Sequence, residues 1–151
     1  MNASRISEYK REYDAELVPM WREAFEFGVG VKDPHPIEEQ LVYLHEQVLP
    51  TNTVHLAWVG SKLAGFIACN QESVTQLHVR VGLHRQGIGS RLLSLAKSAS
   101  TGSLWLFTFQ QNLVARQFYE HHGFKPILFG FEPTWQLADV KYRWVSAPDA
   151  A

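Results

Sequence analysis

Residues 77–93 read LHVRVGLHRQGIGSRLL and join a predicted strand to a predicted helix through a short basic loop with glycines. The N–H groups of such a loop and of the first helical turn have no partner inside the helix, and the helix dipole attracts negative charge. Gly87 and Gly89 have no Cβ atom, so a pyrophosphate could approach the main chain closely. The pattern favours an anion site, and the alternative is an ordinary turn between a strand and a helix.

Two established nucleotide-binding patterns are absent from the sequence. It contains neither Gly-x-Gly-x-x-Gly nor Gly-x-x-x-x-Gly-Lys followed by Ser or Thr. Their absence argues against a Rossmann fold and against a P-loop. An anion that is recognised through another part of its molecule is therefore favoured over a simple nucleotide.

Length and composition are typical of one globular domain over residues 1–151. Hydrophobic residues make up 46% of the 151 residues, aromatic residues 13% and charged residues 19%. The formal net charge of −1 argues against a general nucleic-acid binder, because such proteins carry a basic excess or a basic stripe. We therefore expect no nucleic-acid partner.

The single cysteine and the apolar residues indicate in which compartment the protein occurs. The histidines indicate whether it binds a metal. Cys69 is the single cysteine, so no intrachain disulfide can form, and its apolar neighbours favour a buried hydrophobic role over a reactive thiol. The sequence contains no signal-like N-terminal segment and no apolar run long enough to span a membrane. We expect a cytoplasmic protein with no membrane partner. His121 and His122 are adjacent and the other histidines are scattered, so we expect no metal.

The pattern of apolar residues predicts an order of strands and helices. Helical spacing predicts a first helix that Gly28 and Gly30 end and a second that ends at Pro50. Three strands then form an antiparallel meander that leads into the glycine loop. The predicted strands cover residues 5–9, 54–59, 63–69, 73–81, 104–109, 125–129 and 139–145; the predicted helices cover 14–27, 37–48, 88–99 and 112–122. The fold class is α/β or α+β, with a right-handed strand–helix–strand unit at its centre.

Two motifs in this order resemble the GNAT (Gcn5-related N-acetyltransferase) family. The first is Leu77-x-Val79 followed by QGIGSxLL at 86–93, which is similar to the central cofactor motif of the family. The second is NxxAxxxYxxxGF at 112–124, which looks like its later helix. In the pattern of the family, His84 here takes a position usually held by Gln or Arg, and Val81 stands where proline is common. The resemblance covers residues 5–145.

This resemblance implies a fold and a reaction. The fold is a mixed central sheet of about six to seven strands with flanking helices, in which the fourth and fifth strands splay apart. The pantetheine arm of acetyl-coenzyme A lies in that gap. The implied reaction is that of an N-acetyltransferase, in which an amine would attack the thioester directly, through a tetrahedral intermediate and without a covalent enzyme species.

The resemblance also assigns residues to the cofactor. Main-chain groups of Val79 and Val81 would pair with the pantetheine amides, and Asn112 would bind the pantetheine or cap its helix. Arg85 or Arg91 could add charge-assisted contacts, although both could equally be solvated surface residues. The amides expected to hold the pyrophosphate are those of His84, Gln86, Gly87, Gly89 and Ser90. Arg85 and Ile88 complete the expected cofactor-binding residues of the loop.

The expected catalytic residues are Tyr119, Glu72 and His78. Tyr119 lies seven residues after Asn112, two helical turns on, and by resemblance it would give a proton to the departing thiolate. Glu72 and His78 are two candidates for the general base. Each has a structural alternative: Tyr119 could pack its ring on the core, Glu72 could be a turn residue and His78 a core or edge histidine.

By resemblance, the acceptor pocket lies between the first two helices and the late strands. Trp21, Phe25 and Phe27 are the expected substrate-binding residues, with the further candidates Val29, His35, Phe131 and Trp135. Aromatic residues at helical spacing could equally belong to the core. The acceptor is left open among a small amine, a peptide N-terminus and a lysine side chain.

Two other functions remain as alternatives. One is a non-catalytic module that binds or senses acyl-coenzyme A, and the other is a nucleotide-phosphate binder unrelated to acyl transfer. The sequence leaves the oligomeric state open between a monomer and a homodimer.

Overall fold

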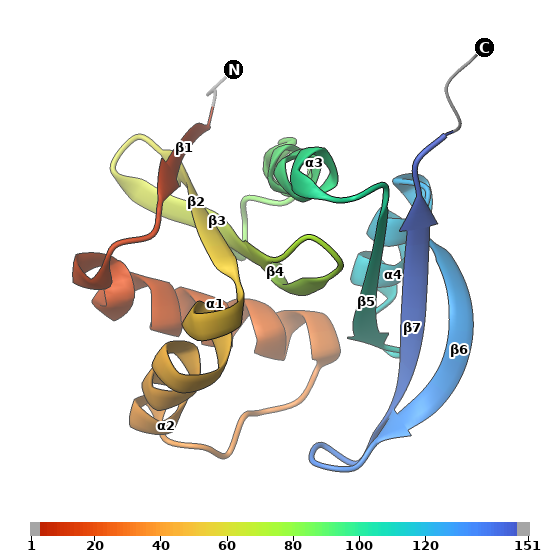
Figure 1. Cartoon of the computed structure of the whole chain (residues 1–151). Helices are drawn as coiled ribbons and strands as arrows, with labels where there is room; N and C mark the ends of the chain where they lie inside the picture. Colours follow the sequence, from red (N-terminus) through yellow and green to blue (C-terminus); the bar gives the residue numbers. More distant parts are fainter. Residues whose placement is uncertain (1–3, 148–151) are drawn as a thin grey trace.

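The structure is a computed structural model, and it describes residues 4–147. The predicted single domain over 1–151 also includes residues 1–3 and 148–151, which lie outside the described residues. The elements are β1 (Arg5–Glu8), α1 (Asp14–Val29), α2 (Ile37–Tyr43), β2 (Thr53–Val59), β3 (Lys62–Cys69), β4 (Val74–Val79), α3 (Ile88–Ala99), β5 (Ser103–Phe109), α4 (Leu113–His121), β6 (Lys125–Glu132) and β7 (Leu137–Val145) (Figure 1).

Within residues 4–147, seven strands form two antiparallel sheets, in the orders β1-β2-β3-β4 and β5-β7-β6. A single parallel bridge between Ser73 and Trp105 joins β4 to β5, and the Trp105 N–H donates to the Glu72 carbonyl at 3.0 Å. Beyond this point no described hydrogen bond links the two strands, so β4 keeps an open edge toward its C-terminal end. The structure confirms the predicted α/β class. It also confirms the prediction of six to seven strands and the splaying of the fourth and fifth strands.

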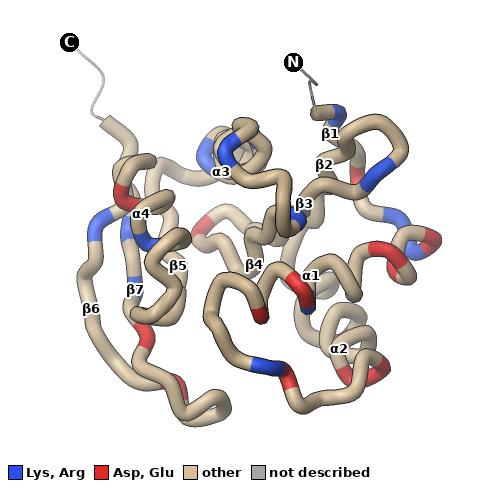
Figure 2. The backbone as a smooth tube through the Cα atoms, turned by 180° about the vertical axis from the view of Figure 1, so that it is seen from behind, with Lys and Arg blue, Asp and Glu red and all other residues tan. Residues whose placement is uncertain are grey.

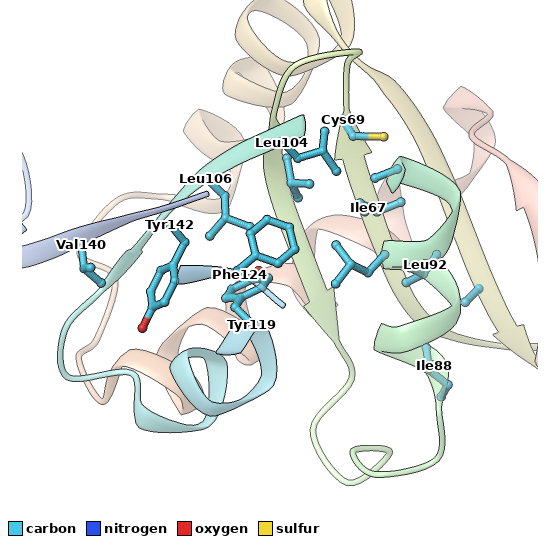
Figure 3. Close-up of a cluster of buried hydrophobic side chains, with 14 of the residues drawn as sticks. Ile67, Cys69, Ile88, Leu92, Leu104, Leu106, Tyr119, Phe124, Val140 and Tyr142 are labelled. Carbon is cyan, nitrogen blue, oxygen red and sulfur yellow. The ribbon is translucent and has the colours of Figure 1, made fainter. Parts of the chain in front are cut away.

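Apolar side chains fill both faces of the first sheet. Along β3, Phe66 and Ala68 face the helices α1 and α2, whereas Ile67 and Cys69 face α3, because successive side chains of a strand alternate. The cluster on the α3 side continues into the second sheet through Leu106 and other residues (Figure 3). The two sheets therefore share a core although one bridge joins their backbones. Cys69 is buried there, as predicted.

The first helix is longer than the glycines in it predict. Gly28 lies inside α1, and the helix ends at Gly30, which has a left-handed φ of 82°. An added Cβ at Gly28 would lie 2.8 Å from Nδ2 of Asn112. Gly28 therefore allows the close approach of two segments that are distant in sequence, and the expectation that it breaks the helix was wrong.

Other boundaries also differ from the predictions. The strand predicted over 73–81 ends at Val79, because Gly82 turns the chain with φ 94° and the Arg80 guanidinium bonds back to the Leu63 carbonyl at 2.5 Å. The second predicted helix consists of α2, a π-helical turn (Leu44–Val48) and a short 3₁₀ turn. The last two strands extend further than their hydrophobic patterns indicated, to Glu132 and back to Leu137.

Candidate functional site

The loop between β4 and α3 presents a continuous run of main-chain donors. The N–H of Leu83 bonds to the Arg80 carbonyl, and the N–H of Arg91 bonds to the Gly87 carbonyl. Between them, the N–H groups of residues 84–90 have no hydrogen-bond partner among the described residues. Such a run at a helix N-terminus is the arrangement that binds phosphate. The predicted anion loop is therefore built as a set of unsatisfied donors.

Backbone conformation shapes this loop. Gly87 caps α3 with φ 80°, and a Cβ there would meet no atom within 4 Å. Arg85 adopts φ 65°, an uncommon value for a residue with a side chain. An added Cβ at Gly89 would lie 3.1 Å from the ring of Phe118. Gly87 therefore faces open space, whereas Gly89 lets α3 pack closely on α4.

A cavity of about 340 Å³ adjoins the loop and the open edge of β4. Its wall comes from the C-terminal half of α1, the end of β4, the glycine loop and the first turns of α4. Predicted site residues that the structure brings together here are Phe27, His78, Val79, His84, Gly89, Asn112 and Tyr119.

Tyr119 has a buried ring and directs its hydroxyl to this cavity. Its ring packs edge-on against Phe118 and Phe124 at centroid distances of 5.4 and 5.7 Å. No described group bonds its hydroxyl oxygen. This oxygen keeps some exposure to solvent and faces the cavity. Desolvation raises the pKa of Tyr119. Its hydroxyl therefore keeps its proton at neutral pH.

His78 lies on β4 with one ring nitrogen engaged and one free. Nε2 is 2.9 Å from Oε1 of Gln76, and the ring stacks on Phe66 at 5.6 Å. Because the amide oxygen accepts, Nε2 carries the proton and Nδ1 keeps a lone pair. Desolvation lowers the pKa of His78 to about 4, so the ring is neutral at neutral pH.

The structure does not bring Glu72 into the same cavity. Its side chain is exposed in the turn before β4, where its N–H donates to Oδ1 of Asn70 at 2.9 Å. It lies six residues before His78, on the order of 20 Å along an extended chain. The two predicted candidates for the base are therefore far apart, and His78 is the one at the cavity.

His84 closes the cavity on the side of the first helix. Its ring stacks on that of Phe27 at a centroid distance of 5.9 Å and an interplanar angle of 20°. Desolvation lowers the pKa of His84. The stack links α1 to the glycine loop across the cavity.

Ser90 is tied to a histidine that the sequence analysis did not select. Its Oγ lies 2.9 Å from Nε2 of His122, at the end of α4, and Lys97 donates to the His122 carbonyl at 2.7 Å. Desolvation and the nearby Lys97 lower the pKa of His122. In the sequence, the pair His121-His122 bears only on metal binding. The contact with Ser90 could not be predicted, because it depends on how α3 and α4 pack.

Asn112 caps α4, which is one of its two predicted roles. Its Oδ1 accepts from the Ala115 N–H at 3.2 Å. The preceding residue, Gln111, donates through Nε2 to the Val29 carbonyl at the end of α1. Gln111 and Gly28 both line the cavity and were not predicted. Gly28, a glycine inside a helical pattern, was the one sign in the sequence that α1 and Asn112 approach each other closely.

The remaining cofactor candidates lie outside the cavity wall. Gln86 and Arg85 are exposed in the loop, and Arg91 donates to Oγ of Ser4 at 3.2 Å. Val81 lines a second opening, beside Glu23 of α1. Ile88 is buried in the core beneath the loop.

The aromatic residues predicted for the acceptor separate into different environments. Trp21 is buried and packs edge-on against Phe66 at 5.5 Å, so it is part of the core. Phe25 packs on Trp135 at 4.8 Å, between α1 and the β6–β7 turn. Phe27 lines the cavity. Of the further candidates, Val29 is buried, Phe131 is 62% exposed on β6, and His35 contacts Trp135 at 5.6 Å.

The described part of the chain contains neither a cluster of metal-ligating side chains nor a membrane-spanning helix. Residues 4–147 contain no group of three or more His, Cys, Asp or Glu side chains placed to hold a metal ion. Within the same residues no helix combines the length and apolar character needed to span a bilayer.

A glycine loop at the end of a splayed strand thus shares one cavity with a helix that carries a buried tyrosine. The chain belongs to the GNAT family, because the family model described as an acetyltransferase (GNAT) domain matches residues 50–126, just over half of the chain. It is therefore an acyltransferase of the GNAT type. No curated protein sequence matches the chain closely enough to count as a relative.

Solved structures share this fold at low sequence identity. Apo-form YjaB from Escherichia coli has a TM-score of 0.77 at 20% identity, over 96% of this chain and 99% of that chain. The PaiA N-acetyltransferase of Thermoplasma acidophilum, solved in complex with coenzyme A, has a TM-score of 0.74 at 19% identity, over 95% and 99%. A GNAT acetyltransferase from Staphylococcus aureus Mu50 also has 0.74 at 19%, over 96% and 100%. These likenesses establish the fold and leave the reaction to the residues of the site.

Proposed function

We propose that this chain transfers the acetyl group of acetyl-coenzyme A to a primary amine by direct attack. The observation that carries the proposal is the run of unpartnered N–H groups over residues 84–90, beside a cavity that also contains Tyr119 and His78. The structural similarity to a PaiA enzyme solved with coenzyme A supports it. The acceptor is an amine of a small molecule or of a peptide.

The chain offers complementary groups for the two polar parts of coenzyme A. The donors of residues 84–90 suit a pyrophosphate, and the left-handed Gly87 leaves room for it next to the main chain. The open edge of β4 at Val79 offers main-chain groups to the amides of a pantetheine arm, as a neighbouring strand would. Val81 lines the second opening, so we assign it only a contact with the pantetheine arm at the rim of the main cavity.

When bound, acetyl-coenzyme A supplies an acyl group that the thioester activates toward nucleophiles. Tyr119 holds a proton at Oη until the sulfur departs, because burial keeps its pKa high. Its hydroxyl has no described partner that would have to be displaced. We assign Tyr119 as the general acid.

His78 is proposed to accept the proton of the attacking amine at Nδ1. Gln76 holds Nε2, which leaves the lone pair of Nδ1 free, and the lowered pKa keeps the ring neutral near pH 7. Glu72 could reach the site only through a chain of water molecules, given its place before β4. His78 is therefore preferred as the base.

The acceptor is proposed to enter on the side of α1. Phe25, Phe109 and Trp135 form an aromatic wall there, with the Phe25 ring 6.2 Å from Phe109 and 4.8 Å from Trp135. Such a wall suits an amine with an apolar or aromatic body.

We place the protein in the cytoplasm as one domain, on the basis of its composition and its lone buried cysteine.

Two measurements test this function. A thermal-shift comparison should show stabilisation by coenzyme A that exceeds that by ADP, because ADP lacks the pantetheine arm. An acceptor panel with acetyl-coenzyme A should then release free thiol with at least one amine. Equal stabilisation by both ligands would instead favour a nucleotide-phosphate binder. Tight binding of coenzyme A with no thiol release on a broad panel would favour a non-catalytic binding module.

A further inference from the structure

Ser90 and His122 form a contact between two helices beside the glycine loop. Ser90 lies in the first turn of α3, and its Oγ is 2.9 Å from Nε2 of His122, the residue that follows α4. Both residues are half-buried. The N–H of Ser90 belongs to the run over residues 84–90 that has no partner among the described residues. The hydroxyl of Ser90 is therefore placed to add one side-chain donor to these main-chain donors.

The helix α3 holds His122 at two separate points. One is the contact of Ser90 with the ring. The other lies two turns further along α3, where Nζ of Lys97 donates to the His122 carbonyl at 2.7 Å. The His122 ring also packs on that of Phe118 at a centroid distance of 4.5 Å, and Phe118 lines the cavity. These contacts hold the imidazole against the first turn of α3.

The hydroxyl of Ser90 has a single proton, which it can give either to His122 or to a ligand. If Oγ donates to Nε2 of His122, no proton is left for a ligand. If Nε2 instead carries the imidazole proton and donates to Oγ, the hydroxyl proton is free to bond an anion. An ionised phosphate oxygen can only accept a hydrogen bond. Phosphate at the loop therefore selects the arrangement in which His122 is the donor.

The charges around this pair favour an anion. Between Glu72 and Glu120 the sequence contains no acidic residue, and α3 carries the cations Arg91 and Lys97 (Figure 2). Desolvation and the nearby Lys97 lower the pKa of His122, so its ring is neutral at neutral pH. A neutral imidazole has one N–H, and the side that carries it decides which way the Ser90 proton points.

We propose that His122 is a positioning residue of the coenzyme A site: its Nε2 donates to Oγ of Ser90 and so directs the Ser90 hydroxyl to the pyrophosphate. This inference rests on the proposed function, because it takes the pyrophosphate as the anion at residues 84–90. Without the donor from His122, the hydroxyl can turn back to a main-chain carbonyl of the preceding turn, as serine does in helices. The affinity for coenzyme A then depends on the end of α4 as well as on the loop.

Calorimetry with coenzyme A tests the proposal without any acceptor. His122→Leu should raise the Kd about five- to twentyfold, because the Ser90 hydroxyl loses its donor. His122→Gln keeps an N–H donor at Nε2 and should restore the Kd to within about twofold. His121→Gln, at the exposed neighbouring position, is the matched control and should bind like the unmodified chain. An unchanged Kd in His122→Leu would refute the proposal, and so would a His122→Gln variant as weak as His122→Leu.

A double variant tests whether the two side chains act as a unit. Ser90→Ala should weaken binding about as much as His122→Leu, and the variant with both substitutions should be no weaker than Ser90→Ala alone. Circular dichroism checks that all variants fold. Losses that multiply in the double variant would show that His122 acts through the packing of α4, and would overturn the proposal.

Two further measurements identify the phosphate and the donor. Dephospho-coenzyme A keeps the pyrophosphate and lacks the 3′-phosphate, so His122→Leu should lose as much affinity for it as for coenzyme A. A loss confined to coenzyme A would assign the contact to the 3′-phosphate and overturn the proposal. In nitrogen-15 NMR of the complex, Nε2 of His122 should carry the proton; a proton on Nδ1 would refute the proposal. An unmodified chain that binds no coenzyme A would refute the proposed function and this inference with it.

Discussion

Two side chains in the cavity differ in the protonation state that burial favours. Burial keeps Tyr119 protonated and His78 neutral, so one holds a proton to give and the other a lone pair to receive one. Each group is therefore in the protonation state that its proposed role requires at neutral pH.

Replacement of Tyr119 by phenylalanine should lower turnover by about 10²–10⁴-fold and leave the affinity for coenzyme A nearly unchanged. The reason is that the variant loses the proton donor and keeps the packed ring. Steady-state thiol release and calorimetry measure the two quantities. Tyr142→Phe is the control, because that hydroxyl bonds Glu120 and Arg116 instead of facing the cavity. Unchanged turnover in Tyr119→Phe would remove the residue from the mechanism.

The stability of the protein should depend on pH through His78. The unfolded chain binds a proton at about pH 6.5 and the folded chain only near 4, so the unfolded state binds more protons between these values. The free energy of unfolding should therefore rise with pH over this window, by up to about 3 kcal/mol. Urea unfolding at a series of pH values measures it. His78→Phe should flatten the rise and the exposed His121→Gln should not; equal curves for all three proteins would contradict the assignment.

At the scale of elements, the glycine loop and the start of α4 were both predicted from motifs. The loop follows from glycine spacing after a strand, and the cap of α4 follows from an asparagine before a helical pattern. Local sequence determines such features, because they involve neighbouring residues. The boundaries of β4 and α1 were less accurate, because contacts with distant segments set them.

Gly87→Ala should weaken coenzyme A binding by at least about tenfold and lower stability by about 1–2 kcal/mol. The loss of stability comes from the left-handed backbone, and the loss of affinity comes from the methyl group and the distorted donors. Gly60→Ala is a matched control, because Gly60 has φ 61° and equally open surroundings in the β2–β3 turn. It should lose similar stability and keep its affinity. Equal affinities of both variants for coenzyme A in calorimetry would contradict the proposed pyrophosphate site at residues 84–90.

Asn112→Ala should lower the free energy of unfolding by about 1 kcal/mol, because α4 loses its N-cap. Asn112→Asp should restore most of that loss. Gln117→Ala, at an exposed position inside α4, gives the baseline for an alanine in the same helix. Denaturant unfolding compares the three variants, and an Asn112→Ala variant as stable as Gln117→Ala would show that the cap contributes nothing.

At the scale of the whole molecule, two sheets joined by one bridge are held together by side chains. Leu106 of β5 is buried in the shared core (Figure 3), whereas its neighbour in sequence, Phe107, is 52% exposed. Leu106→Ala should therefore cost about 2–5 kcal/mol, and Phe107→Ala less than about 1 kcal/mol. Chemical denaturation at low protein concentration measures both. Similar losses in the two variants would mean that packing between the sheets does not hold the fold together.

The sequence by itself determined the order of strands and helices, the glycine loop before α3 and the position of the tyrosine on its helix. These depend on periodicity, glycines and caps, which act over a few residues. Only the tertiary structure decided that His78 and not Glu72 adjoins the cavity, that Trp21 belongs to the core, and that β6 is left with an open edge. Each of these depends on which distant segments pack together. Residue spacing along the chain does not contain that information, because burial and desolvation arise from neighbours far apart in sequence.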